Sequence, residues 1–106
     1  MVMTRRVQAI RDLWEQFEIN LQFARESVGT LRSWHSAMVN WDFIKSEYGV
    51  PEDLDLSFEW LLDLREKALN WTRAKPEVTE EEVAGAYRVY HSTTDWLRHM
   101  FPGAGV

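Results

Sequence analysis

Apolar residues recur every three or four positions through the first third of the chain. This spacing is typical of one face of a helix that packs in a coiled coil or a helical bundle. Residues 1–50 contain no proline, so the pattern predicts a long helical segment over residues 4–48. The apolar positions that define it are Val7, Ile10, Trp14, Phe17, Leu21, Ala24, Val28 and Leu31.

The rhythm of this segment changes near Gly29. The steps from Val28 to Leu31 and from Leu31 to Trp34 are both three residues, which overwinds a heptad pattern. Gly29 and the threonine after it are also poor helix formers. We therefore expect a kink or a break near Gly29. Continuity would give one helix of about 45 residues, whereas a break would give two helices of about 20 residues each and a four-helix bundle.

A second helix is predicted over residues 54–74. It follows a Gly-Val-Pro break at residues 49–51, and its start is expected between Asp53 and Ser57. Its apolar face is broad, which indicates contact with two neighbouring helices. That face consists of Leu54, Phe58, Leu61, Leu62, Leu64, Ala68, Leu69 and Trp71.

The last helix, predicted over residues 80–101, has the clearest start signal in the chain. Thr79 and Glu82 match a capping box, in which each side chain accepts a hydrogen bond from the other residue's backbone N–H. Val78 and Val83 stand where a hydrophobic staple would lie. The expected buried stripe comprises Val83, Ala86, Tyr87, Tyr90, Thr94, Leu97 and Phe101.

Together these segments predict an all-α fold, an antiparallel bundle of three to four helices. A chain of 106 residues is one domain, residues 1–106, and it is large enough to bury a core without disulfides. The tail at residues 102–106 reads Pro-Gly-Ala-Gly-Val and is expected to be flexible.

Charge and composition narrow the function classes. The net charge of −5 arises entirely in residues 51–106, which hold six basic and eleven acidic side chains. This balance disfavours nucleic-acid binding and suits a basic partner. The chain has no cysteine, which excludes Cys-ligated zinc and fits the cytoplasm. No apolar run is long enough to span a membrane, and we expect neither a cofactor nor a metal.

Six tryptophans in 106 residues are the strongest compositional feature. Trp34, Trp41 and Tyr48 follow one another at intervals of seven, one position off the apolar seam. This row either fills the core or faces a partner, since Trp is enriched at interface hot spots. The candidate partner-binding set is Trp34, Met38, Trp41, Tyr48, Trp71 and Trp96. The excess of apolar surface predicts an oligomer, most simply a homodimer.

The leading hypothesis is therefore a small cytoplasmic, non-enzymatic protein-binding module. Inhibitor, immunity and adaptor proteins fit this description, as do the antagonists that phages and mobile elements carry. No catalytic set assembles in the sequence, whereas aromatic residues and a one-sided acidic charge do.

The carboxylates support a different hypothesis. Glu15 and Glu18 form an E-x-x-E pair, and Glu59 and Asp63 share a face of the second predicted helix. This arrangement is similar to all-helical nucleotide pyrophosphohydrolases, which hold magnesium with two such pairs. Their second element is E-x-x-D, whereas here Glu59 and Asp63 are one residue further apart. The resemblance would imply a magnesium-dependent enzyme.

The arginines support a third hypothesis. Arg11, Arg25 and Arg32 occupy the same heptad position beside the seam. Such residues usually set the pairing of helices, but they could also clamp a small anionic ligand, such as a nucleotide, between protomers.

Overall fold

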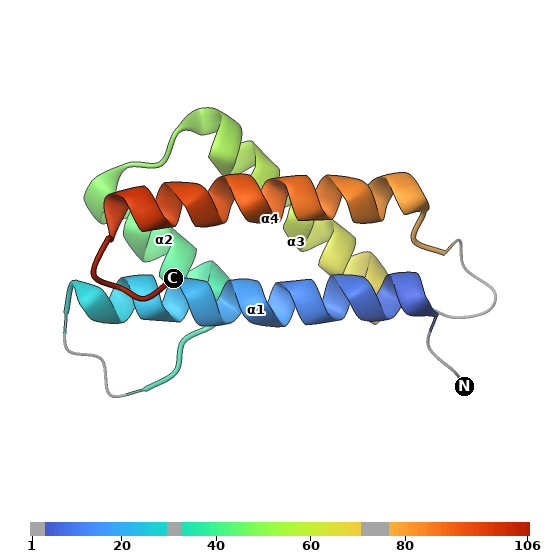
Figure 1. The fold of residues 1–106 in the computed structure, drawn as a ribbon, viewed down its shortest axis with the longest axis horizontal. Helices are drawn as coiled ribbons and strands as arrows, with labels where there is room; N and C mark the ends of the chain where they lie inside the picture. Colours follow the sequence, from blue (N-terminus) through green and yellow to red (C-terminus); the bar gives the residue numbers. More distant parts are fainter. Residues whose placement is uncertain (1–3, 30–32, 71–76) are drawn as a thin grey trace.

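Four α-helices form the protein in a computed structural model that describes residues 4–29, 33–70 and 77–106 (Figure 1). No strand occurs within these ranges. The all-α prediction is therefore confirmed, and the four-helix alternative is the one observed. The helices are α1 (Arg5–Ser27), α2 (Ala37–Tyr48), α3 (Glu52–Leu69) and α4 (Glu80–Met100).

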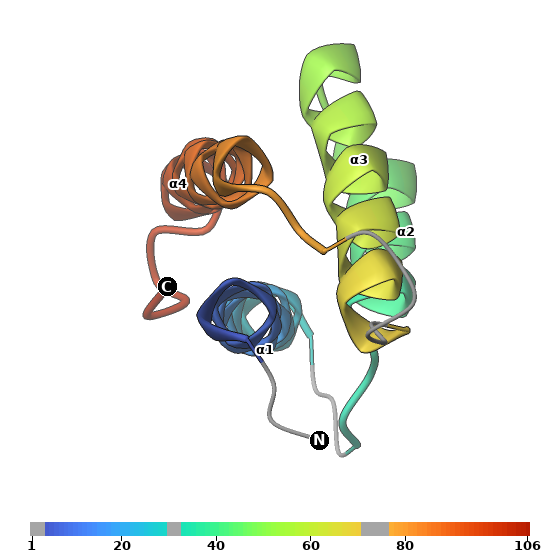
Figure 2. The ribbon, with the colours of Figure 1, turned by 90° about the vertical axis from the view of Figure 1, so that its right-hand side faces the viewer.

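Helices α1 and α4 lie side by side and run in the same direction (Figure 1). Their first turns meet where Arg6 Nη1 donates to the Val78 carbonyl at 3.3 Å and Arg6 lies 3.6 Å from Glu80. Helices α2 and α3 cross one side of this pair (Figure 2). The short turn at residues 49–51 reverses the chain between α2 and α3, as the sequence predicts. The bundle is thus antiparallel through its short connections, with one parallel pair, α1 and α4.

The break after Ser27 falls where the sequence places it, and buried polar groups hold the joint. Gln22 is only 1% exposed. Its Oε1 accepts hydrogen bonds from His35 N and from Asn40 Nδ2, both at 3.0 Å. Helix α2 begins after Ser36, whose hydroxyl accepts from a backbone N–H in the first turn of α2. These bonds fix the new direction of the chain, because each buried donor would lose its partner if the joint opened.

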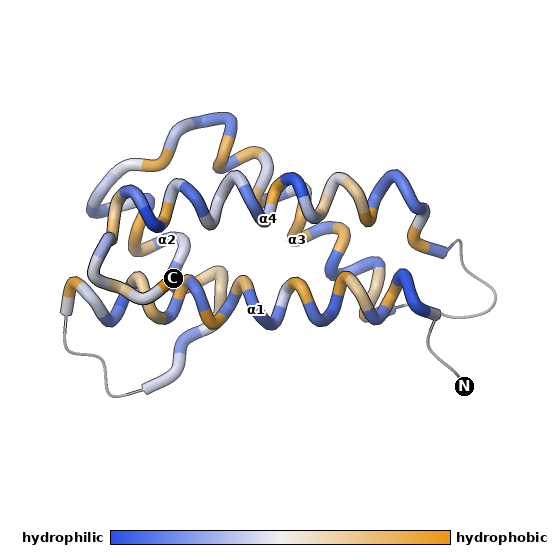
Figure 3. Tube along the Cα trace, viewed as in Figure 1, coloured by the Kyte–Doolittle hydropathy of each residue, from blue (hydrophilic) through white to orange (hydrophobic). Residues whose placement is uncertain are grey.

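The apolar seam of α1 is buried from Val7 to Ala24. Phe17, with no exposed surface, lies at the centre and its ring is 5.9 Å from Phe58 and 6.4 Å from Tyr90. The seam ends with the helix, since Val28 is 39% exposed. Leu31 lies outside the described residues. Figure 3 shows this alternation of hydrophobic and hydrophilic positions along α1 and α4.

Helix α3 is shifted toward the N-terminus relative to the prediction. It begins at Glu52, directly after Pro51, and ends at Leu69 instead of residue 74. Asn70 closes the helix, with its side chain donating to the Glu66 carbonyl at 2.8 Å. Residues 71–76 lie outside the described residues.

Helix α4 confirms its predicted start. Glu82 N donates to Thr79 Oγ1 at 3.1 Å, and Thr79 N donates to Glu82 Oε1 at 2.9 Å. The prediction that Tyr87 is buried is wrong: it is 45% exposed. The side of α4 that meets the core instead includes Gly85, against which the Trp60 indole packs so closely that a Cβ there would lie 2.8 Å from Trp60 Cη2.

The last residues turn back toward the bundle. Ala104 N donates to the Phe101 carbonyl at 3.0 Å, and Arg98 Nε donates to the Val106 carbonyl at 2.8 Å. Ala104 and Val106 pack against the core. The flexibility expected of residues 102–106 stays a prediction. Helices α1 to α4, the helical part of the described chain, include none with both the length and the apolar character to cross a membrane.

Candidate functional site

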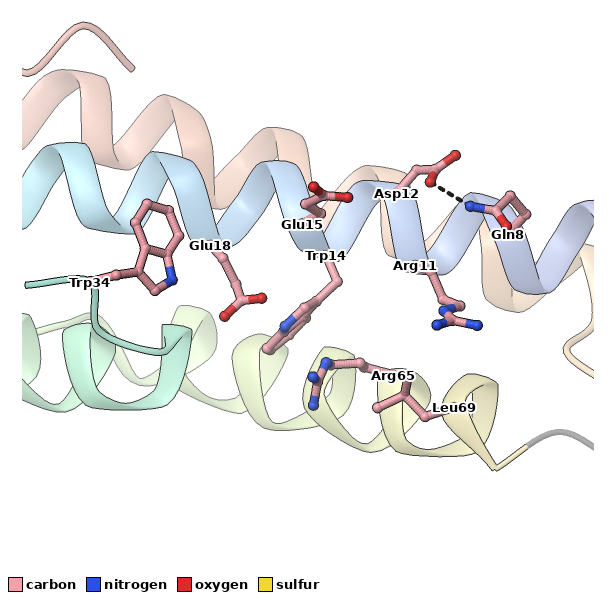
Figure 4. Close-up of a pocket in the computed structure, with 9 residues that line it drawn as sticks. All are labelled: Gln8, Arg11, Asp12, Trp14, Glu15, Glu18, Trp34, Arg65 and Leu69. Carbon is pink, nitrogen blue, oxygen red and sulfur yellow. Dashed lines mark hydrogen bonds between the residues drawn. The ribbon is translucent and has the colours of Figure 1, made fainter.

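A groove of about 560 Å³ lies between α1 and α3 (Figure 4). It is formed by one face of α1, the second half of α3 and the segment that leads into α2. Its lining combines aromatic, acidic and basic side chains: Gln8, Arg11, Asp12, Trp14, Glu15, Glu18, Trp34, Arg65 and Leu69. Such a volume lies within the usual range for ligand and side-chain pockets.

The two ends of the groove differ in chemistry. Trp14 points from α1 toward α3 near the middle, with Glu18 and Trp34 toward one end (Figure 4). The Arg65 guanidinium lies beside Trp14, and Arg11 lies toward the other end (Figure 4). The Arg65 guanidinium is 5.2 Å from the centre of the Trp14 ring, a cation–π distance. Within the described part of the chain, the buried Trp14 Nε1 has no hydrogen-bond partner.

The row of Trp34, Trp41 and Tyr48 does not form one surface. Trp34 is 57% exposed and Trp41 only 1%. Trp41 stacks on Phe58, with ring centroids 4.7 Å apart and planes at 10°. The break after Ser27 redirects α2 so that its face bearing Trp41 packs into the core. Trp41 therefore cannot contact a partner in the folded chain, which corrects its assignment to the candidate surface.

The remaining candidate aromatic residues are also dispersed. Met38, in the first turn of α2, is 48% exposed. Tyr48 is 44% exposed, but its ring meets that of Phe101 edge-on at 5.1 Å. Trp96 is half-buried, with its ring 6.2 Å from Trp41. Trp71 lies outside the described residues. Two exposed members of the proposed set, Trp34 and Met38, therefore lie close together in sequence at the start of α2.

Trp41 is held by a charged hydrogen bond that the sequence does not reveal. Its Nε1 donates to Asp55 Oδ1 at 2.9 Å, and Lys45 Nζ lies 2.6 Å from Asp55 Oδ2. The hydrogen bonds from Lys45 and from Trp41 lower the pKa of Asp55, against a smaller opposing effect of burial. The same hydrogen bond to Asp55 raises the pKa of Lys45. This cluster stabilises the contact between α2 and α3.

The three arginines of the anion hypothesis are not brought together. Arg11 lines the groove, whereas the Arg25 guanidinium lies 3.3 Å from the centre of the Phe43 ring. Arg32 lies outside the described residues. Because Arg11 and Arg25 are fourteen residues apart on α1, about 21 Å separates them along the axis. Arg11 instead shares the lining of the groove with Arg65.

The four carboxylates of the magnesium hypothesis are split as well. Glu15 and Glu18 line the groove, while Glu59 and Asp63 are exposed on α3 and do not line it. Among residues 4–29, 33–70 and 77–106, no three or more Asp, Glu, His or Cys side chains are grouped to hold a metal ion. The geometry therefore gives the hydrolase hypothesis no specific support.

No protein-family model matches the chain, and no match was found among curated proteins or solved structures.

Proposed function

We propose that this chain is a non-enzymatic protein-binding module and that the groove between α1 and α3 is its partner-binding surface. The observation that carries the proposal is the exposure of Trp34. Its side chain is 57% exposed beside a groove that it helps to line. Met38 is 48% and Val39 49% exposed in the adjoining turn of α2.

The exposed part of Trp34 is large enough to act as an interface anchor. A tryptophan can bury about 250 Å², so the 57% that is exposed corresponds to about 140 Å². At about 25 cal/mol per Å², covering this area would contribute about 3.5 kcal/mol. This is an upper estimate, and it falls in the range that defines an interface hot spot.

The class of partner is part of the same proposal. The net charge of −5 suits a basic partner protein. The chain itself would then act in the cytoplasm as an inhibitor, immunity or adaptor protein. The chain also forms a homodimer through its exposed apolar residues in this proposal.

Comparative affinity capture tests it, with the full chain as bait. Trp34→Ala is compared with Leu56→Ala, a matched control because Leu56 is 58% exposed and does not line the groove. We expect the wild type and Leu56→Ala to retain the same proteins and Trp34→Ala to lose them. Circular dichroism should show that all three are equally helical. Retention of the same proteins in equal amounts by all three baits would contradict the proposal.

A small anionic ligand is the second candidate function. One observation favours it, the presence of both Arg11 and Arg65 in the groove, since two guanidinium groups can bind a phosphate or a carboxylate. Pyrophosphate or ATP should then raise the melting temperature of the wild type and leave that of Arg65→Met unchanged. Equal melting temperatures with and without these anions would count against it.

A further inference from the structure

The charged side chains that point into the groove are sorted by sign along its length. From α1, Glu18 and Arg11 point toward α3, and Arg65 points back from α3 (Figure 4). Glu18 lies at the Trp34 end, the Arg65 guanidinium lies beside Trp14 near the middle, and Arg11 lies toward the opposite end (Figure 4). The other two acids of the lining, Asp12 and Glu15, are directed away from α3 (Figure 4). The groove is therefore bipolar.

From this arrangement we infer that the groove binds a peptide segment carrying one basic and one acidic side chain about 10 Å apart. The inference rests on the proposed function and specifies the chemistry of the partner at the same site.

The end formed by Trp34 and Glu18 suits a lysine or arginine of the partner. The exposed indole of Trp34 offers a face to a cation, an interaction that gains strength as water is excluded. Glu18 supplies a carboxylate whose position is fixed, because its Oε2 accepts a hydrogen bond from Ala37 N at 3.3 Å. The aromatic face of Trp34 and the carboxylate of Glu18 together favour a cationic side chain over a neutral one.

The part of the groove from Arg65, beside Trp14, to Arg11 suits an aspartate or glutamate. Arg65 is positioned by the Trp14 ring, 5.2 Å away, and its side chain is 30% exposed. Arg65 Nη1 also lies 3.6 Å from Glu66 Oε1, an exposed ion pair that contributes little energy and that a better placed carboxylate can replace. The guanidinium groups of Arg65 and Arg11 both line this part of the groove, and guanidinium–carboxylate hydrogen bonds are among the strongest in proteins.

The distance between the ends sets the spacing in the partner. Glu18 and Arg11 are seven residues apart on α1, which corresponds to about 10.5 Å along the axis. A partner helix spans the same distance between residues i and i+7. In an extended segment, residues i and i+3 are also about 10 Å apart, but their side chains point to opposite faces, so the helical spacing is the one that fits the groove. The volume of about 560 Å³ has room for the side chains of such a segment, with its backbone outside the groove.

Selection of random 16-residue peptides displayed on phage, with the full chain as target, tests the inference. Recovered peptides are synthesised, and their affinities are measured by fluorescence anisotropy. The groove variants are Glu18→Gln, which keeps an oxygen for Ala37 N, and Arg65→Met, which keeps an unbranched chain against Trp14. Their matched controls are Glu59→Gln and Arg88→Met, exposed residues that do not line the groove.

We expect recovered peptides to share a basic and an acidic residue at a separation of seven. Each groove variant should weaken their binding about tenfold, while the controls stay within twofold of the wild type. Replacing the basic residue of the peptide by a neutral one should weaken its binding to the wild type. The same replacement should weaken its binding to Glu18→Gln only slightly, because the carboxylate is already lost there.

Two results would overturn the inference, and they are distinguishable. Peptides that lose binding in Trp34→Ala but bind Glu18→Gln and Arg65→Met as tightly as the wild type would refute the bipolar recognition and leave the proposed function standing. Recovery of no peptide, or only of peptides that bind Trp34→Ala as tightly as the wild type, would refute both.

Discussion

Asp55→Ala is expected to destabilise the fold far more than Asp55→Asn, because the two substitutions treat the buried indole of Trp41 differently. Alanine leaves Trp41 Nε1 without its acceptor at 2.9 Å, a hydrogen bond to a charged group worth about 1.5–3 kcal/mol. Asparagine keeps an oxygen for Trp41 and loses the pair with Lys45, whose side chain is 50% exposed and which therefore contributes little. The expected loss is therefore about 1.5–3 kcal/mol for alanine and much less for asparagine.

Thermal unfolding followed by circular dichroism measures this difference. A gap of about 2 kcal/mol between the two variants corresponds to roughly 8–16 °C in melting temperature for a domain of this size. Lys45→Met serves as the control, since it removes the ion pair and leaves the Trp41 bond intact. If Asp55→Asn melts as low as Asp55→Ala, the charge and not the indole acceptor is what the fold requires, and the reasoning fails.

The same bond predicts a pH dependence. The pKa of Asp55 in the folded chain lies below its ordinary value of 3.8, so the unfolded chain binds the proton first as the pH falls. The stabilisation is therefore present above the ordinary value and is lost as the pH falls through the folded pKa. We expect the wild type to lose more stability than Asp55→Asn over this acidic range. Parallel curves for the two proteins would contradict the prediction.

Three further perturbations follow from the fold. Gln22→Met should cost about 2–4 kcal/mol in urea unfolding, because it removes the acceptor of the His35 N–H and one of the two acceptors of the buried Asn40 amide. Phe23→Ala, at the next and 41% exposed position, should cost less than about 1 kcal/mol, and equal costs would refute the role of the joint. Thr79→Ala should cost about 1 kcal/mol by removing half of the capping box, and an unchanged urea midpoint would argue against it. Light scattering across a concentration series should give the mass of a homodimer, and a constant monomer mass would remove that part of the proposed function.

The apolar pattern was sufficient to predict the helices, because burial at intervals of three and four residues is a local property of the chain. The seam from Val7 to Ala24, the break near Gly29 and the capping box at Thr79 all follow from residues close in sequence. The pattern did not predict which way α2 faces after the break. That orientation depends on Gln22 and its bonds across the joint, and an isolated glutamine carries no signal of burial.

The groove was less predictable for the same reason. Trp34 and Glu18 were both singled out from the sequence, but for different hypotheses, and nothing local indicated that they share one site. Arg65 was not singled out at all, since its approach to Trp14 depends on how α3 crosses α1. Trp41 illustrates the converse: a heptad interval from Trp34 suggests a shared face only while the helix is continuous, and here it is not.

The parallel pairing of α1 and α4 determines when the core can close during synthesis. Its contacts join residues about seventy positions apart, as between Asn20 and Tyr90, so α1 emerges from the ribosome long before α4. Until then, the side of Phe17 that Tyr90 covers stays uncovered, together with the rest of that side of the α1 seam. Such surface on a nascent chain is prone to aggregate or to recruit chaperones. Folding of this small helical protein therefore waits for its last helix, although most of its helix-forming signals are local.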